Sequence, residues 1–364
     1  MQSLASSSSN QDDAEARRAP GREITVEVLL NATKLSVGKH EHLAHYLKRI
    51  THLALNGDAS KALLKGGSDS GGAIRKIQNL HHCPNLKVLY LYDNEVEAIE
   101  NLDAVPQLTH LHLQGNCLRR IENLEALTLL EKLYLEKNAI ERLEGLAGCF
   151  RLQELYLANQ RVPQDAFFSF EEETLRTLAG SLRILDLSNC RVASTKPLSL
   201  LRNLEQLDLS KNLIEELEDV FALVGGATSL VELDLRGNPV TAATKYREKT
   251  ITFSSARLAL LDKKDVDPNQ RRMMQSHLAH KYRKRLEPTN ARRQSPEGGR
   301  SSGLSESTRL LKHGATVHQL RSMQFTATHA KSRSVREGLG VAGASCSPSS
   351  TALMKASNNN SKYN

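Results

Sequence analysis

Leucine recurs along the chain in a short pattern whose clearest copies begin 22 residues apart. Residues 86–94 read LKVLYLYDN and residues 108–116 read LTHLHLQGN, with leucine at the first, fourth and sixth positions and asparagine at the ninth. Further copies begin at residues 130, 152, 182, 204 and 230, and a weaker one, ITHLALNGD, begins at residue 50. Alternation of the fourth and sixth positions is typical of a short strand with one buried face. The pattern therefore predicts a stack of short strands, one from each copy.

The ninth position predicts a buried ladder of polar side chains. Backbone groups at the point where each coil turns away from its strand need hydrogen-bond partners, because they are buried between coils. Gln160 and Cys190 stand at this position in two copies. We expect the ladder to consist mainly of asparagines, namely Asn94, Asn116, Asn138, Asn212 and Asn238.

Apolar residues at short intervals after each asparagine predict the return segment of a coil. A 22-residue period leaves room there for a 3₁₀ or single-turn helix. Besides the first copy, which holds an insert, two copies are longer, since 30 residues separate positions 152 and 182, and 26 separate positions 204 and 230. We expect a helix over residues 174–178 in the copy that begins at residue 152. In the copy that begins at residue 204 we expect an enlarged convex side.

These copies have the form of leucine-rich repeats, in which each coil buries its apolar edge only against its neighbours. The expected fold is α/β, a right-handed solenoid of about eight 22-residue coils with a parallel concave sheet, capped ends and disordered termini. The insert around GGSDSGG, residues 66–72, predicts a flexible surface loop. The expected boundaries are a disordered N-terminus (1–22), an N-terminal cap (23–49), the repeats (50–237), a C-terminal cap (238–262), a basic helix (263–287) and a disordered basic tail (288–364).

Charge and cysteine content limit the classes of function. The net charge is +8, but residues 263–364 contain 19 Lys or Arg and 6 Asp or Glu, so they carry +13 and residues 1–262 carry −5. The five cysteines are odd in number and lack CxxC spacing, which favours a reducing compartment without disulfides or a zinc site. Neither an apolar signal sequence nor a long uncharged apolar run is present in the sequence, which predicts a soluble intracellular protein with no membrane contact.

The third, fifth and seventh positions of the repeats share the open face of the predicted sheet. Tyrosines and histidines gather in its N-terminal half and carboxylates in its C-terminal half. Exposed aromatic side chains suit a protein interface, and the carboxylates favour a basic partner surface. The candidate binding residues are Val88, Tyr90, Tyr92, His110, His112, Gln114, Lys132, Tyr134, Glu136, Glu154, Tyr156, Asp186, Gln206, Asp208, Glu232 and Asp234.

Other candidates carry weaker signals. KTITF, with Lys249, Ile251 and Phe253, fits a short docking pattern for type-1 protein phosphatase, but its place in the predicted cap favours a structural role. Histidines cluster within residues 40–45 and 277–280 without the further ligands of a metal site. Because no nucleophile, base and pocket combine, we expect neither a cofactor nor an enzyme activity.

The repeats resemble those of the leucine-rich repeat regulatory subunits of type-1 protein phosphatase. The residues that carry the resemblance are IENL (121–124), LEKLYL (130–135) and NQRVP (159–163), the last followed by TLRTLAGSLRILDLSN (174–189). The resemblance covers about residues 24–285. It implies a non-enzymatic scaffold that binds the phosphatase catalytic subunit through the concave face and regulates or targets it at the centrosome, basal body, cilium or flagellum.

Two other functions fit the same sequence. One is an axonemal or centrosomal assembly or dynein-associated protein that uses the concave face without binding phosphatase. The other is a nuclear RNA-processing adaptor that relies on the basic tail, which is disfavoured because the tail lacks aromatic platforms for single-stranded nucleic acid. The basic run KYRKR, residues 281–285, could instead contact tubulin or another acidic cytoskeletal surface.

Overall fold

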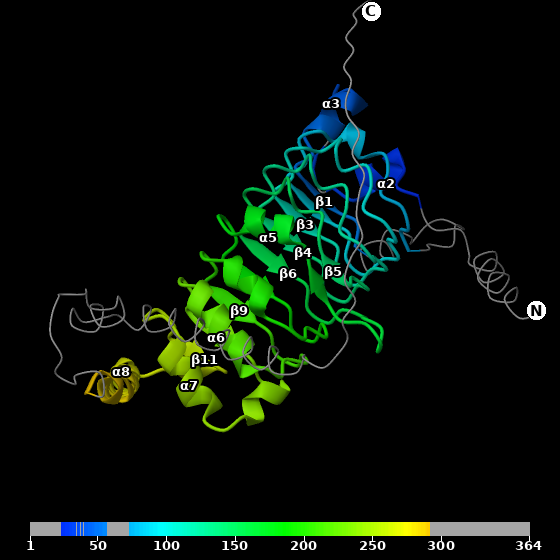
Figure 1. The fold of residues 1–364 in the computed structure, drawn as a ribbon. Helices are drawn as coiled ribbons and strands as arrows, with labels where there is room; N and C mark the ends of the chain where they lie inside the picture. The colour runs from blue at the N-terminus through cyan, green and yellow to red at the C-terminus, as the bar shows by residue number, and fades with distance from the viewer. Residues whose placement is uncertain (1–22, 34, 37, 39, 57–72, 292–364) are drawn as a thin grey trace, which may run out of the picture. The chain divides into compact units, whose positions relative to one another are not determined.

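A computed structural model of the 364-residue chain describes residues 23–33, 35–36, 38, 40–56 and 73–291, with the side chains of residues 282 and 284–291 excepted (Figure 1). The expectations for the N-terminus, the glycine-rich insert and residues 292–364 lie outside the described residues. In the part of the chain that is described, no helix is both long enough and apolar enough to cross a membrane.

Ten short strands form one sheet whose order is β1-β2-β3-β4-β6-β8-β9-β10-β11-β12. Neighbours pair in parallel down to β11, which pairs antiparallel with β12. Equivalent repeat positions face each other, so Leu89 pairs with Leu111 and Leu111 with Leu133. This architecture confirms the α/β repeat solenoid with a parallel sheet. The strands are β1 (His52–Ala54), β2 (Val88–Tyr90), β3 (His110–His112), β4 (Lys132–Tyr134), β6 (Glu154–Tyr156), β8 (Ile184–Asp186), β9 (Gln206–Asp208), β10 (Glu232–Asp234), β11 (Leu260–Leu261) and β12 (Lys264–Asp265).

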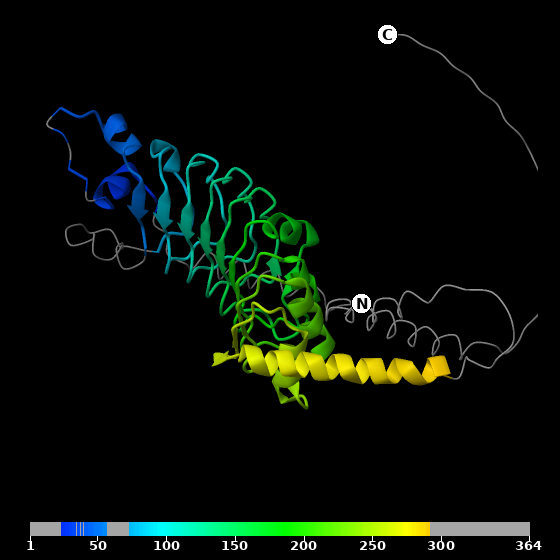
Figure 2. The same cartoon turned by 90° about the vertical axis from the view of Figure 1, so that its left-hand side faces the viewer.

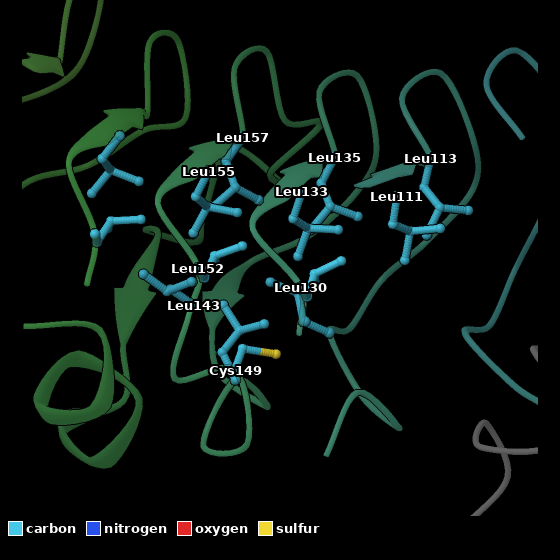
Figure 3. Packing of buried hydrophobic residues seen from close by; sticks show 14 of the residues in the cluster. Leu111, Leu113, Leu130, Leu133, Leu135, Leu143, Cys149, Leu152, Leu155 and Leu157 are labelled. Atoms are coloured by element: carbon cyan, nitrogen blue, oxygen red, sulfur yellow. The ribbon is translucent and has the colours of Figure 1, made fainter. Parts of the chain in front are cut away.

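The core is a row of leucines that repeats from coil to coil. Figure 3 shows Leu111 and Leu113 with their equivalents Leu133 and Leu135 in the next coil, in nearly the same orientation. All four are fully buried. Because each leucine packs against its counterparts in adjacent coils, apolar burial holds each coil to the next one rather than to a common centre.

Return segments differ with coil length. In a 22-residue coil they close through i to i+3 backbone bonds, such as Val105 N to Leu102 O at 3.0 Å and Leu108 N to Val105 O at 3.1 Å. The longer coils contain true helices, α5 (Glu172–Leu178) and α6 (Leu217–Gly226), which confirms the helix expected over 174–178. The remaining return-side elements are η1 (Leu80–His82), η2 (Lys196–Leu200) and a parallel pair, β5 (Arg142–Leu143) and β7 (Ser169–Phe170).

The predicted asparagine ladder connects consecutive coils. Asn138 Oδ1 accepts a hydrogen bond from Leu118 N at 3.1 Å, and its Nδ2 donates to Leu113 O at 3.0 Å and Leu135 O at 2.9 Å. Gln160 makes the corresponding bonds one coil later, since its longer amide still reaches both coils. Asn94, Asn116, Asn212 and Asn238 repeat the same arrangement.

Cys190 takes over the donor role of a ladder asparagine. Its thiol contacts Leu157 O at 3.0 Å, where an asparagine amide would donate. The same sulfur lies 3.3 Å from Ser188 O, in its own coil. A thiol therefore serves at the ladder step between the coils that begin at Leu152 and Leu182.

A second series of asparagines on the return side was not predicted. Asn101 Nδ2 donates to Ile77 O at 2.6 Å and Asn123 Nδ2 to Ile99 O at 2.7 Å, and both backbones are left-handed, with φ of 58°. Asn79 begins the series, and Gly145 takes its place in the fourth coil with φ of 72°. These residues recur every 22 positions, and each comes directly before a leucine of the return segment. This recurrence could have identified the series from the sequence.

Elements outside the repeats close both ends of the stack. The N-terminal elements are α2 (Val26–Asn31) and α3 (Leu43–Lys48), with Leu29, Tyr46 and Leu47 buried. The C-terminal elements are η3 (Pro239–Ala242), α7 (Tyr246–Phe253), the β11–β12 hairpin and α8 (Pro268–Ala291), which Figure 2 shows as one continuous helix. Helix α8 extends through residues 288–291, beyond the expected boundary at residue 287, since each added residue extends a helix once it has formed.

Candidate protein-binding face

The fifth positions of four consecutive strands form a continuous stack of rings. Tyr90 and His112 have ring centroids 4.6 Å apart, His112 and Tyr134 4.2 Å, and Tyr134 and Tyr156 4.8 Å. The last two pairs are almost parallel, with interplanar angles of 7° and 3°. We call these four residues the ring stack. All of them are half-buried, so each ring keeps part of its surface open to a partner.

The sequence builds the ring stack through its repeat register. In-register parallel strands lie about 4.8 Å apart, which is close to the separation at which aromatic rings pack face to face with an offset. Tyr92, at the seventh position, meets the first ring edge-on, with centroids 6.4 Å apart and an interplanar angle of 89°. The N-terminal half of the face thus presents a preorganised aromatic surface.

The ring stack is uncharged at neutral pH. The pKa of His112 is lowered to about 4, mainly by burial and to a smaller extent by His110 and Lys132. Burial likewise raises the pKa of Tyr134, and raises that of Tyr156 to about 12 with a contribution from Glu154. The rings therefore offer neutral, apolar area together with hydroxyl groups.

The third positions form a second column beside the ring stack. Lys132 Nζ lies 2.9 Å from Glu154 Oε1, and Tyr156 donates its hydroxyl to Glu154 Oε2 at 3.2 Å. Burial lowers the pKa of His110, and Lys132 adds to the shift. Val88 is only 8% exposed, so this predicted interface residue belongs mainly to the core. The other third-position candidates, Gln206 and Glu232, are exposed and half-buried, respectively.

Two of the predicted seventh-position residues have buried oxygens. Gln114 Oε1 and Glu136 Oε2 are both shielded from solvent and have no hydrogen-bond partner among the described residues. Burial raises the pKa of the Glu136 carboxyl. A partner that supplies hydrogen-bond donors at these positions would offset the desolvation cost of both oxygens.

Aspartates continue the fifth-position column beyond the ring stack. Asp186 Oδ1 accepts from Ser188 N at 2.9 Å and Asp208 Oδ1 from Ser210 N at 2.8 Å. Asp234 is different, because it is 1% exposed and covered by a salt bridge to Arg236 at 2.7 Å. The acidic surface predicted at all three aspartates is therefore limited to the first two.

Two cationic residues near these aspartates were not predicted from the sequence. Arg236 occupies a seventh position, so repeat register could have identified it. Lys263 comes from the turn between β11 and β12, and its ammonium forms an ion pair with Glu232. No repeat pattern places Lys263, because the hairpin lies after the last repeat.

The phosphatase docking candidate lies inside helix α7. Ile251 is 2% exposed, and the ring of Phe253 stacks on Phe221 with centroids 4.3 Å apart. Lys249 N donates within the helix to Lys245 O at 2.9 Å. A docking strand needs an extended backbone and free side chains, so this segment closes the cap in the described conformation.

One of the histidines within residues 40–45, His45, contacts the Glu41 carboxylate. His45 Nδ1 and Arg49 Nη1 both lie within 2.8 Å of Glu41 carboxylate oxygens. In the described part of the chain, no group of three or more histidine, cysteine, aspartate or glutamate side chains could hold a metal ion.

Comparison with known proteins identifies the repeats. The family described as "Leucine Rich repeats (2 copies)" matches residues 106–148 and 181–222. An internalin from Listeria monocytogenes is 22% identical, with a TM-score of 0.46 over 60% of this chain and 62% of its own. A leucine-rich repeat protein from Leptospira interrogans is also 22% identical, with a TM-score of 0.40 over 52% of each chain. Internalin C2 from Listeria monocytogenes is 22% identical, with a TM-score of 0.41 over 60% of this chain and 88% of its own. This chain thus spans less than two thirds of the first two proteins.

Proposed function

Because the chain is a leucine-rich repeat protein, we propose that it is a non-enzymatic scaffold whose concave face binds another protein. The observation that carries this proposal is the ring stack, in which four neutral rings are held in register by the sheet. Aromatic side chains fixed before binding lose little conformational entropy in an interface and bury large areas. An open face of this kind favours partner binding over a purely structural role.

We propose the catalytic subunit of type-1 protein phosphatase as the partner, with regulation or targeting of that enzyme as the role. The support is the sequence resemblance, which extends in its finer detail to protein phosphatase 1 regulatory subunit 42, including the NQRVP segment at residues 159–163. In the same proposal the complex acts at microtubule-organising or ciliary structures, as the resemblance implies.

Calorimetric titration of the full chain with the phosphatase catalytic subunit tests both parts of the proposal. The informative variant is Tyr90→Ala with Tyr134→Ala, because both rings belong to the ring stack. Truncation of an aromatic interface anchor costs about 2 kcal/mol or more, so we expect binding to weaken by a factor of at least about 30 for each ring that acts as an anchor. The matched control is Phe150→Ala, which removes a 63% exposed ring outside the concave strands.

The two parts of the proposal fail differently. If the parent chain does not bind the phosphatase, the choice of partner is wrong. If the parent binds and the folded double variant binds equally well, the concave face is not the interface. Circular dichroism of each variant establishes that the fold is retained.

Helix α8 provides a second proposed contact, to an acidic cytoskeletal surface such as tubulin. Arg272, Lys281 and Arg283 are exposed along the helix. Exposed charges act at long range and are screened by salt. Co-sedimentation with microtubules should therefore fall when the salt is raised and when these three residues are changed to glutamine. Co-sedimentation that is unchanged by both would contradict this contact.

A further inference from the structure

The ring stack ends at Tyr156, and a hollow begins there. Tyr156 pairs in register with Asp186, which in turn pairs with Asp208. An aspartate side chain is much shorter than a tyrosine side chain. The fifth-position side chains therefore rise less far above the sheet from Asp186 onward, which leaves a hollow of about 170 Å³. Tyr156, Asp186, Asp208 and Lys263 are among the residues that line it. One face of the last ring thus borders an open space with carboxylates at its base.

The charges around the hollow do not balance. Asp186, Asp208, Glu232 and Asp234 line it, and the salt bridges of Glu232 with Lys263 and of Asp234 with Arg236 account for two of these carboxylates. Asp186 and Asp208 take part in no ion pair within the described residues. Each uses Oδ1 to accept a backbone N–H bond, and Asp186 also has a hydrogen bond with the Ser188 side chain.

The pair is also costly for the protein in the absence of a partner. Burial raises the pKa of Asp186, and the adjacent Asp208 charge raises it further. Two like charges on neighbouring strands, both half-buried, repel each other and are poorly solvated. A cation placed between them would relieve both effects, whereas an apolar side chain would worsen the desolvation.

We propose that this hollow receives an arginine side chain of the partner protein, with the guanidinium group stacked on Tyr156 and hydrogen-bonded to Asp186 and Asp208. This inference rests on the proposed function and specifies the chemistry of the partner. A guanidinium is planar, so it continues the ring stack by one member, and its N–H groups form a fork that matches carboxylates. Lysine fits less well, since its ammonium is strongly hydrated and has no flat face to stack.

The test uses the full chain and three capped pentapeptides that differ only at the central residue, which is arginine, lysine or citrulline. Citrulline keeps the planar shape and removes the charge. The amides of Ser188 and Ser210 report on the site by NMR, because each donates to one of the two carboxylates. We expect the arginine peptide to shift both amide signals saturably, the lysine peptide to bind at least about fivefold more weakly, and the citrulline peptide to leave them unchanged.

Two sets of variants separate the carboxylates from the ring. In Asp186→Asn with Asp208→Asn, the amide oxygen can still accept the backbone bond, so the turn is kept while the charge is lost. We expect at least a tenfold loss of arginine-peptide affinity, compared with no change in Asp103→Asn, an exposed acid outside the concave strands. Tyr156→Leu should reduce the preference for arginine over lysine to about one.

Several outcomes would overturn this inference. One is equal binding of the arginine and citrulline peptides, and another is unchanged arginine affinity in the double asparagine variant. A third is an arginine peptide that shifts neither the Ser188 nor the Ser210 amide signal.

Failure here is distinguishable from failure of the proposed function. If phosphatase binding is lost with the Tyr90 and Tyr134 variant but kept in the double asparagine variant, the concave face binds the phosphatase and the arginine contact is wrong. If the arginine peptide binds as expected but the phosphatase does not, the hollow is an arginine site and the proposed partner is wrong.

Discussion

His112 makes the ring stack sensitive to acid. Its pKa is lowered from 6.5 to about 4, mainly by burial, so the folded state binds fewer protons than the unfolded state in this interval. Stability from the neutral imidazole is fully present above pH 6.5 and is lost as the pH falls through about 4. For one proton, the free energy of unfolding changes with pH by at most about 1.4 kcal/mol per pH unit. The change is smaller here because the ring is only partly buried.

We therefore expect His112→Phe to flatten the acid side of the stability profile. Phenylalanine retains a stacking ring and cannot titrate, so the advantage of the parent over the variant should decline by about 1 kcal/mol between pH 7 and pH 4.5. Urea denaturation of both chains at a series of pH values measures this difference. The contribution of the carboxylates to the pH dependence is common to both chains and cancels in the comparison. Parallel profiles for parent and variant would contradict the assignment of the low pKa to His112.

Asn138 is the residue at which the ladder should be most sensitive to truncation. Its amide satisfies three backbone groups in two coils, and it is fully buried. Asn138→Ala would leave these groups without partners, so we expect the free energy of unfolding to fall by about 2 kcal/mol or more. The control is Asn203→Ala, since the exposed Asn203 donates one bond to Gly180 O and its loss should cost about 0.5 kcal/mol or less. Similar losses in both variants would show that the ladder adds little to stability.

At the scale of the elements, Gly145 shows where backbone geometry constrains a coil. Its φ is 72°, and a Cβ atom there would lie 2.0 Å from Ile121 O, so any side chain forces adjacent coils apart. We expect Gly145→Ala to lower the free energy of unfolding by about 2 kcal/mol. The steric clash of the new Cβ adds to the strain of an alanine in the left-handed backbone conformation. Gly180→Ala is the matched change, because nothing lies within 4 Å of a Cβ at that position and it should be tolerated. Equal stability of the two variants in thermal melts would contradict the contact argument.

The strands and the long-coil helices could be predicted because they follow local rules. Leucine alternation fixed the strands, and the register then placed Tyr90 and Tyr156 in one column without further information. Exposure could not be predicted in the same way. Val88 and Asp234 occupy positions equivalent to open ones, but their burial depends on neighbours that the repeat does not specify, such as Arg236.

Elements outside the repeat were harder to predict from sequence. The β5–β7 pair joins two return segments that share no pattern, and β12 reverses direction in the cap. The hollow beside Tyr156 was also not predicted as a unit, although Tyr156 and both aspartates were named individually. The depth of the hollow comes from the change of side-chain length along the fifth positions. Its net charge depends on Lys263, which comes from the β11–β12 hairpin and pairs with Glu232.

At the scale of the whole solenoid, stability depends on the ends because each coil contacts only its neighbours. The C-terminal end is closed by α7, the β11–β12 hairpin and the first turns of α8. Arg271 joins these parts, as its 5% exposed side chain donates to Ala256 O and Leu258 O from the start of α8. Burial lowers its pKa, yet those carbonyls satisfy two of its nitrogens.

Arg271→Ala should therefore release the start of α8 and weaken the stack from its C-terminal end. In a one-dimensional stack the lost cap exposes the last coil first, so amide hydrogen exchange should accelerate most in β11 and β10, less in β9, and least in β2 and β3. Arg272→Ala, one residue along and exposed, should leave the exchange pattern unchanged. Uniform acceleration along the whole sheet would mean that the coils unfold as a single unit, and the cap would then stabilise every coil equally. A gradient would show instead that the Asp186–Asp208 end of the concave face depends more on the cap than the ring stack does, because it is closer to the cap along the strand order.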